Sequence, residues 1–157
     1  MKMGKREEVL AFITPLTAEF EGFSASVYKC PAGFDTIGYG RNIEANPLSV
    51  EEKAKLVDGK VSKELAQEWL EQELGRCYDA CNKAFAWFKD LDTKRAGAIV
   101  DMAYNMGLGT LKTFKNSLGF MERKDYKGAA ENFRKSRWYA QVKRRGVRIT
   151  EIIERGA

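Results

Sequence analysis

The side chains with catalytic potential in this chain are carboxylates and cysteines, because histidine is absent. Of 157 residues, 22 are Asp or Glu, three are Cys and none is His. Without an imidazole there is no Ser-His-Asp or Cys-His pair, no histidine-liganded metal and no histidine proton shuttle near pH 7. We therefore expect acid–base chemistry to depend on carboxylates, with Cys, Lys and Tyr as the other available groups.

Glu21 is the first candidate for such chemistry. It lies between Phe20 and the pair Gly22 and Phe23, at the predicted end of a helix. The partial negative charge of a helix C-terminus and apolar neighbours both disfavour a carboxylate, so we expect them to raise its pKa. A raised carboxyl pKa is what a general acid for glycosidic cleavage requires. Position alone is weak support, because most glutamates near helix ends are solvated.

Two further residues follow Glu21 at short intervals. Cys30 comes nine residues later and Thr36 six residues after that, at the start of the sequence TIGYG. With the intervening EGF, YK and PAGF, this segment resembles the active-site segment of the phage-type lysozymes, glycoside hydrolase family 24, in which a Glu, an Asp or Cys and a Thr show the same gaps. The resemblance continues in order through DMAYNMG (101–107), KNSL (115–118), AAENF (129–133) and KSRWY (135–139).

The resemblance implies an endolysin, a muramidase that hydrolyses the β-1,4 bond between N-acetylmuramic acid and N-acetylglucosamine in peptidoglycan, with inversion. It implies that Glu21 is the general acid, and that Cys30 and Thr36 position or activate water on the opposite face of the sugar. An inverting pair needs roughly 6.5–9.5 Å between its groups to admit that water.

Cys30 stands where one family enzyme carries Asp. A thiol of ordinary pKa is mostly protonated at pH 7 and is a poorer base than a carboxylate. Three roles stay open for it: water positioning, which we prefer, a minor reactive thiolate, or a covalent nucleophile giving retention. We leave the neighbouring Asp35 out of the site, because adjacent strand residues point to opposite faces and Thr36 is expected to face the cleft.

The same resemblance implies substrate contacts by Tyr104, Ser117, Asn132 and Asn42. Tyr104 offers a ring for sugar stacking, and Ser117 and Asn132 offer hydrogen bonds to acetamido groups. Asn42 stands where one family enzyme has an apolar residue. Arg41 stands where that enzyme has His, so we expect an ion pair there to be missing or rewired.

No cofactor or metal is expected. Cys77 and Cys81 lie one helical turn apart, but a zinc site would need His or a second Cys pair, so we assign both to packing. An odd number of cysteines also argues against a disulfide framework.

Apolar spacing, caps and turn residues predict the elements that position these side chains. Strand-like runs at 25–29 and 34–38 flank a hairpin turn at 31–33. A capping box from Ser49 to Glu52 opens a helix. A break is expected at Thr14-Pro15, with Thr14 capping the helix that follows, and another near Gly146. The predicted helices cover 5–13, 15–21, about 50–57, 62–85, 93–106, 115–123, 126–135 and 137–154.

These elements predict one α+β domain over residues 1–157, lysozyme-like in architecture. Residues 22–61 form a small strand-containing lobe, and residues 86–157 form a larger all-helical lobe on which 1–21 is expected to pack. A single apolar stripe makes 62–85 a long connecting helix. We expect a cleft between the lobes.

Positive charge gathers at the C-terminal end. The chain carries a net charge of +5, while eight basic and two acidic side chains lie between Arg134 and Arg155. A basic face suits a polyanion, and stem-peptide carboxylates make peptidoglycan anionic. Three alternatives to hydrolysis remain: a lytic transglycosylase acting on the same bond, a lysozyme-like protein that binds wall polymer without cleaving it, and a basic module that binds nucleic acid or anionic lipid through residues 134–148.

Neither a signal peptide nor a membrane-spanning run is evident in the sequence. We therefore expect no membrane insertion. We also expect a monomer without a nucleic-acid partner. It would accumulate in the cytoplasm of a host bacterium and reach the wall after a separately encoded holin has permeabilised the membrane.

Overall fold

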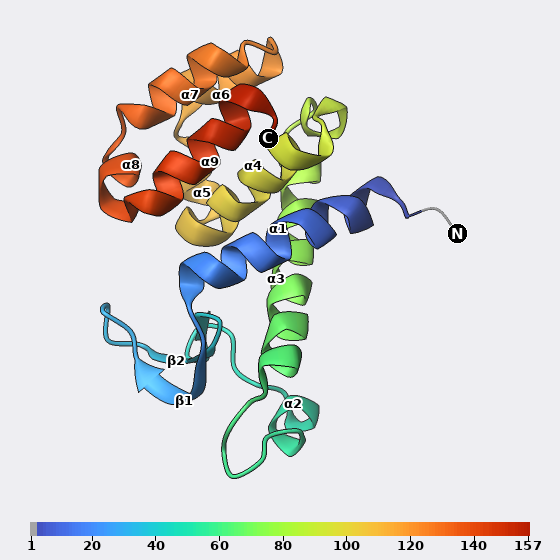
Figure 1. Cartoon of the computed structure of the whole chain (residues 1–157), viewed down its shortest axis with the longest axis vertical. Coiled ribbons are helices and arrows are strands. Elements are labelled where there is room, and N and C mark those ends of the chain that lie inside the picture. The colour runs from blue at the N-terminus through green and yellow to red at the C-terminus, as the bar shows by residue number, and fades with distance from the viewer. Residues whose placement is uncertain (1–2) are drawn as a thin grey trace. The chain divides into compact units, whose positions relative to one another are not determined.

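The computed structural model describes residues 3–157, which form two compact units (Figure 1). The strand-bearing unit is Thr14–Glu73, and the helical unit combines the segment that ends at Ile13 with Leu74–Ala157. Two helices, α1 (Lys5–Glu21) and α3 (Lys63–Ala84), contribute residues to both units. Helices together with a small antiparallel sheet confirm the predicted α+β, lysozyme-like class.

The sheet of the strand-bearing unit has three antiparallel strands in the order β1-β2-β3. They are β1 (Ser24–Lys29), β2 (Asp35–Gly38) and β3 (Arg41–Asn42). Tyr28 pairs with Thr36 across the first two strands, and a bulge interrupts the register between Ser24 and Tyr28. The predicted hairpin turn is confirmed: the Gly33 N–H donates to the Cys30 carbonyl over 2.7 Å, and the Cys30 N–H donates to the Phe34 carbonyl over 2.9 Å.

A short helix, α2 (Val50–Ala54), follows the sheet and begins with the predicted capping box. The Glu52 N–H donates to Ser49 Oγ over 3.0 Å, and the Ser49 N–H donates to Glu52 Oε1 over 2.8 Å. The helix ends three residues earlier than expected. The unit has its own small core, made by Ile37, Val61, Ala66 and Trp69.

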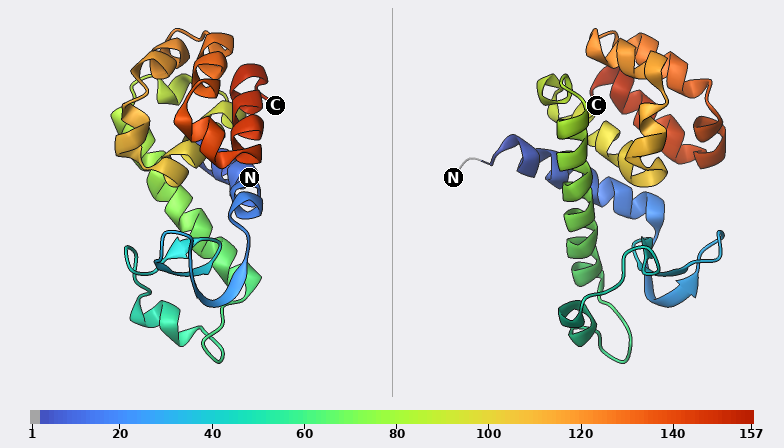
Figure 2. Two further views of the ribbon diagram at one scale, coloured as in Figure 1. Left: turned by 90° about the vertical axis from the view of Figure 1, so that its left-hand side faces the viewer. Right: turned by 180° about the vertical axis from the view of Figure 1, so that it is seen from behind.

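The helical unit holds most of the buried apolar side chains. Within it, α7 lies against α6 and α9, and α9 also lies against α4 and α8 (Figure 2). Its further elements are a 3-10 turn (Phe88–Asp90), α4 (Thr93–Met106), α5 (Leu108–Lys112), α6 (Lys115–Glu122), α7 (Tyr126–Arg134), α8 (Arg137–Val142) and α9 (Arg144–Arg155). The sequence predicted α3 and α4 closely, and missed α5.

The expected break at Thr14-Pro15 is wrong, because α1 runs through both residues. A proline inside a helix removes one backbone donor and strains the preceding turn. Ile13 and Thr17 are fully buried on either side, and burial of this kind outweighs a local cost of a few kcal/mol. Thr14 is buried in the helix interior and does not cap a helix. Its hydroxyl has no hydrogen-bond partner among residues 3–157.

The expected break near Gly146 is also misplaced. The chain turns at Lys143, whose φ is 52° and ψ is −115°, and Gly146 lies inside α9. A Cβ on Gly146 would come within 2.9 Å of Tyr139 Cδ2 and 3.2 Å of Val142 Cγ2. The glycine therefore permits α8 and α9 to pack closely and does not end a helix.

In the part of the chain that the structure describes, no helix is long and apolar enough to cross a membrane.

Candidate active site

Glu21 is the last residue of α1, and its carboxyl group lies against the turn between β2 and β3. Gly22 ends the helix with a positive φ of 73°, while its N–H donates to the Ala18 carbonyl over 3.0 Å. A Cβ added to Gly40 would overlap Oε1 of Glu21 and would lie 3.1 Å from its Cδ. Gly40 also has a positive φ of 74°, which favours glycine. The missing side chain at Gly40 thus makes room for the Glu21 carboxyl, a contact that the sequence does not reveal.

Cys30 and Thr36 lie on either side of the hairpin turn. Cys30 directly follows β1 and is half-buried, whereas Thr36 lies in β2 and is only 3% exposed. The Thr36 hydroxyl donates to the Phe34 carbonyl over 2.9 Å, and the Thr36 side chain contributes to a lowered pKa of the Cys30 thiol. The structure therefore brings these two predicted residues together.

Backbone groups of the turn stabilise the thiolate form of Cys30. The Phe34 N–H makes the largest contribution to a lowered pKa of the Cys30 thiol. Burial opposes this shift, and the N–H groups of Ala32 and Gly33 and the Thr36 hydroxyl reinforce it. N–H donors that converge on a sulfur favour its anion. At a given pH, Cys30 therefore has a larger thiolate fraction than an ordinary cysteine.

Tyr28 is a neighbour of this group that the sequence analysis did not single out. Burial raises the pKa of the Tyr28 phenol, and the negative charges of Glu21 and Cys30 raise it further. Tyr28 precedes Cys30 by two residues and pairs directly with Thr36. The sequence holds one signal for Tyr28: side chains two residues apart on a strand share a face, and Tyr28 precedes Cys30 by two residues.

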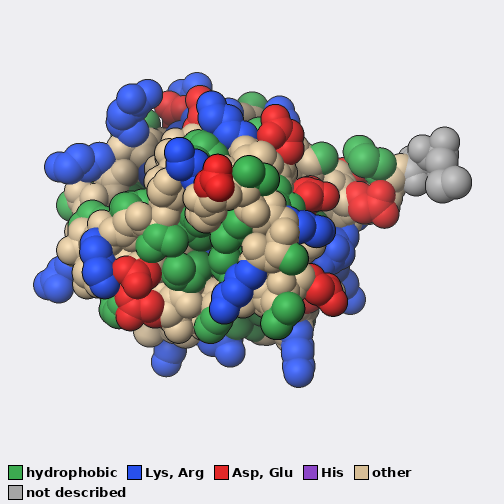
Figure 3. Space-filling view, turned by 90° about the horizontal axis from the view of Figure 1, so that it is seen from below, with side chains coloured by type: hydrophobic (Ala, Val, Ile, Leu, Met, Phe, Trp, Pro, Cys, Tyr) green, Lys and Arg blue, Asp and Glu red, His purple; other side chains and the backbone are tan. Residues whose placement is uncertain are grey.

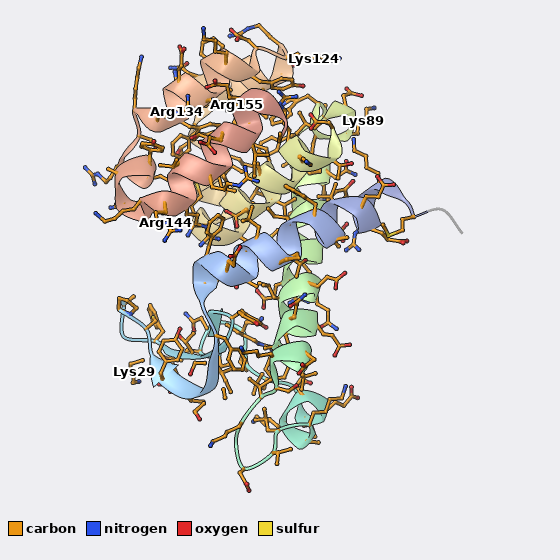
Figure 4. All side chains as sticks on the ribbon, viewed as in Figure 1. Lys29, Lys89, Lys124, Arg134, Arg144 and Arg155 are labelled. Atoms are coloured by element: carbon orange, nitrogen blue, oxygen red, sulfur yellow. The ribbon has the colours of Figure 1, made fainter. Side chains whose placement is uncertain are left out.

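Asp35 forms a separate ion pair on the hairpin. Its carboxylate lies 2.9 Å from Lys29 Nζ, and its N–H donates to a carboxylate oxygen of Glu44. Both side chains of the ion pair are well exposed, and Lys29 extends from the hairpin in Figure 4. This placement gives Asp35 a surface role, in contrast to the buried Thr36 beside it.

Asn42 uses its side-chain oxygen to hold the loop after β3. Oδ1 accepts the N–H groups of Glu44 over 2.9 Å and Ala45 over 3.0 Å. Such a local turn is a common use of asparagine. Only the amide NH₂ of Asn42 therefore remains to donate to a sugar.

Arg41 forms an ion pair with Glu52. Its guanidinium forms a bidentate ion pair with Glu52, at 2.7 and 2.9 Å. It also donates to the carbonyls of Asn46 and Pro47, and it lies over the Trp69 ring at 5.1 Å. The ion pair expected to be missing or rewired is thus rewired to Glu52, and it fixes the segment that follows β3.

The other predicted substrate contacts belong to the helical unit. Ser117 on α6 is 1% exposed, and its hydroxyl donates to Oδ1 of Asn132 on α7 over 3.1 Å. Asn132 and Tyr104, which lies on α4, are both half-buried. The seven predicted residues therefore form two groups, with Glu21, Cys30, Thr36 and Asn42 in the strand-bearing unit and Tyr104, Ser117 and Asn132 in the helical one.

The basic C-terminal segment is partly neutralised within the helical unit. Arg134 pairs with Glu154 at 2.6 Å, and Arg145 forms a buried ion pair with Asp101 at 2.8 Å. Arg134, Arg144 and Arg155 are labelled on this unit in Figure 4. On the face shown in Figure 3, Lys and Arg side chains are interspersed with Asp and Glu. These pairings weaken the case for a basic binding module.

Among residues 3–157, no group of three or more cysteine, aspartate or glutamate side chains is arranged to hold a metal ion. The arrangement at the hairpin offers a carboxyl group, a thiol with a lowered pKa and a buried hydroxyl instead. Such groups suit proton transfer and water positioning.

Comparison with known proteins identifies the family of this chain. The phage lysozyme family matches residues 18–155. "Probable T4-type lysozyme 1" of Dictyostelium discoideum is 30% identical over 152 residues, covering 87% of this chain and 89% of that protein. "Probable T4-type lysozyme 2" of the same organism is 25% identical over 153 residues, with the same coverage. "Pre-baseplate central spike protein Gp5" of Enterobacteria phage T4 is 28% identical over 151 residues, which are 26% of its length. The chain therefore belongs to the phage lysozyme family, and it is a lysozyme, a glycoside hydrolase that acts on peptidoglycan.

Proposed function

We propose that the enzyme cleaves the β-1,4 bond between N-acetylmuramic acid and N-acetylglucosamine with inversion, using Glu21 as general acid and Cys30 with Thr36 to position water. The observation that carries this proposal is the placement of Cys30 and the buried Thr36 on either side of the hairpin turn, whose N–H groups lower the pKa of the Cys30 thiol. A sulfur in this position accepts a hydrogen bond from water and so orients it.

In the proposed reaction, one proton is donated on one face of the sugar and one is released on the other. The Glu21 carboxylic acid gives its proton to the glycosidic oxygen as the bond from that oxygen to the anomeric carbon breaks. Water, positioned by Cys30 and Thr36, attacks the anomeric carbon from the opposite face and releases a proton to solvent. Solvent then returns a proton to Glu21.

The predicted residues of each unit are proposed to contribute glycan contacts of their own. Tyr104 supplies an apolar ring surface. Asn132 and the amide of Asn42 supply hydrogen-bonding groups for acetamido and hydroxyl substituents, and the buried Ser117 acts through its hydrogen bond to Asn132. The existing hydrogen bond between Ser117 and Asn132 fixes the orientation of both side chains before any sugar arrives, which lowers the entropic cost of binding.

In biological terms, we propose an endolysin that lyses a bacterial host at the end of a phage cycle. It would act as a monomer on the cell wall, reached from the host cytoplasm after a holin has permeabilised the membrane. The basic excess of the chain suits a wall polymer whose stem peptides carry carboxylates.

The decisive experiment compares the native protein with Glu21→Gln on a suspension of purified peptidoglycan. The amide keeps the shape of the side chain and cannot donate the proton, so clearing is expected to fall by roughly 10²–10⁴-fold. Circular dichroism and thermal unfolding check that the variant is folded. Equal clearing by both proteins would remove Glu21 from the mechanism.

Analysis of the released sugars separates hydrolysis from its alternatives. An α-anomeric reducing end, seen by NMR before mutarotation, supports inversion, and a β-anomer supports a covalent intermediate on Cys30. A 1,6-anhydro product would identify a lytic transglycosylase. Cys30→Asp is expected to stay active, and Cys30→Ala to lose most of the activity.

A further inference from the structure

Tyr28 stands out among the side chains that the mechanism has not used. In the sequence it lies between Glu21 and Cys30, on strand β1 of the hairpin. The pairing of the strands determines which face of the sheet it occupies. Cross-strand partners on an antiparallel pair point to the same face, so Tyr28 and Thr36 share a face of the sheet.

The strand register places Tyr28 beside Thr36. The electrostatic environment of its phenol agrees with this position. Burial raises the pKa of the Tyr28 phenol, and the negative charges of Glu21 and then Cys30 raise it further. Such charge interactions weaken with distance and solvent screening.

The ring of Tyr28 is accessible to a ligand. Its side chain is 38% exposed. A tyrosine ring that is half open to solvent offers a flat apolar surface for a sugar and a hydroxyl for a hydrogen bond. Its high phenol pKa keeps that hydroxyl neutral and able to donate at physiological pH.

We propose that Tyr28 is a fourth functional side chain of this site, a substrate-binding residue that contacts the sugar beside the scissile bond. The inference rests on the proposed function of Glu21 and Cys30. The ring packs against the sugar, and the phenol donates to one of its oxygen substituents. In this way Tyr28 orients the anomeric carbon between the acid and the water.

Two substitutions separate the roles of the hydroxyl and the ring. Tyr28→Phe keeps the ring and is expected to lower kcat/KM on peptidoglycan about tenfold, the usual cost of losing one hydrogen bond to substrate. Tyr28→Ala removes both and is expected to cost roughly 100-fold. The matched control is Val27→Ala. Val27 is 49% exposed on the same strand and has no role in the proposed mechanism, so its loss is expected to leave clearing unchanged.

A titration tests the placement of Tyr28 without any need for activity. NMR of protein labelled at the tyrosine ζ carbons follows each phenol, and Tyr28→Phe identifies the Tyr28 signal. In Glu21→Gln the negative charge is gone, so the Tyr28 pKa is expected to fall toward its ordinary value. The Tyr78 phenol, whose pKa responds to Arg6 and Asp79, is the internal control and should not move.

The outcomes are distinct. Native clearing with losses in both Tyr28 variants, and a shifted titration, support the proposal. Native clearing that survives in Tyr28→Ala overturns it while leaving the proposed function intact. A Tyr28 pKa that does not respond to Glu21→Gln overturns the placement itself. If the native protein clears nothing, the proposed function fails, and the substrate contact fails with it even where the titration shifts.

Discussion

The hairpin of the strand-bearing unit and the core of the helical unit are built in opposite ways. The hairpin fixes Cys30 and Thr36 with backbone hydrogen bonds and leaves Tyr28 and Phe34 partly open to solvent. The helical core instead removes its side chains from water almost completely, as Phe88 and Phe133 illustrate. One region therefore arranges polar groups at the surface, and the other supplies stability by burial.

This contrast teaches where function and stability can be changed separately. Residues that serve chemistry are often poorly placed for stability, because they keep polar groups ready for a substrate. Substitutions at the hairpin should therefore change activity with little effect on unfolding. Substitutions in the helical core should do the reverse.

The largest expected effect is a difference in stability between two phenylalanine-to-alanine variants, one in each region. Phe88→Ala removes a fully buried ring that packs edge-on against Tyr78 at 5.1 Å. Loss of such a ring costs about 3–5 kcal/mol in free energy of unfolding. Phe34→Ala removes a ring that is 44% exposed, so we expect a change of at most about 0.5 kcal/mol. Urea unfolding of both variants measures the difference, and similar losses at the two positions would contradict the contrast.

A second prediction concerns activity at the hairpin. Gly40→Ala places a Cβ where the Glu21 carboxyl lies, so that carboxyl must shift. A displacement of about 1 Å in a catalytic group costs on the order of 100-fold in rate. Clearing of peptidoglycan by the folded variant measures this loss.

Gly59→Ala is the matched control for Gly40→Ala. Both glycines have a φ of 74°, so both variants pay the same backbone strain of about 1–2 kcal/mol. A Cβ on Gly59 meets no atom within 4 Å. Normal clearing by Gly59→Ala and weak clearing by Gly40→Ala would assign the loss to the Glu21 contact, whereas equal loss in both would assign it to strain.

Local patterns predicted most of the helices and the hairpin. The apolar stripe of α3, the limits of α4 and the capping box of α2 depend on neighbours in sequence, and the structure confirms them. Helix breaks were predicted at Pro15 and near Gly146 because the local sequence does not show the tertiary contacts of these residues. Burial around Pro15 keeps α1 continuous, and the close approach of Tyr139 explains Gly146.

The site was only partly predictable for the same reason. The spacing of Glu21, Cys30 and Thr36 is readable in the sequence because it resembles a family pattern. The contact between Glu21 and Gly40 joins residues that are distant in the sequence, so no pattern of neighbouring residues predicts it. The amide groups around Cys30 likewise depend on the conformation of the turn.

A third prediction concerns the decrease of stability at low pH to which the ion pair of Arg41 and Glu52 contributes. Hydrogen bonds from Arg41 lower the pKa of Glu52 to about 2. A carboxyl whose folded pKa lies below its unfolded pKa adds stability above the unfolded value, and that stability is lost as pH falls through the folded one. We therefore expect the free energy of unfolding to decrease from about pH 4.5 to pH 2.

Glu52→Gln should flatten this part of the profile and lower stability at neutral pH. Asp79→Asn is the control in the helical unit, since its ion pair with Arg6 is exposed and contributes at most about 1 kcal/mol. Unfolding by urea at several pH values compares the three proteins. A native profile that is no steeper than that of Glu52→Gln would be evidence against this role of the ion pair.

The smallest expected effect compares two thiols, one from each region. Backbone N–H donors, with Phe34 first, lower the pKa of Cys30, whereas burial raises the pKa of Cys81 to about 12. Since alkylation requires the thiolate, iodoacetamide should modify Cys30 well before Cys81 in the folded protein, as followed by mass spectrometry of peptides. Thr36→Val removes only a minor donor, so alkylation of Cys30 near neutral pH should slow by a small factor. A Cys30 rate that matches that of an unfolded cysteine peptide at every pH would show that the turn does not stabilise the thiolate, and water activation would then depend on Thr36 and solvent.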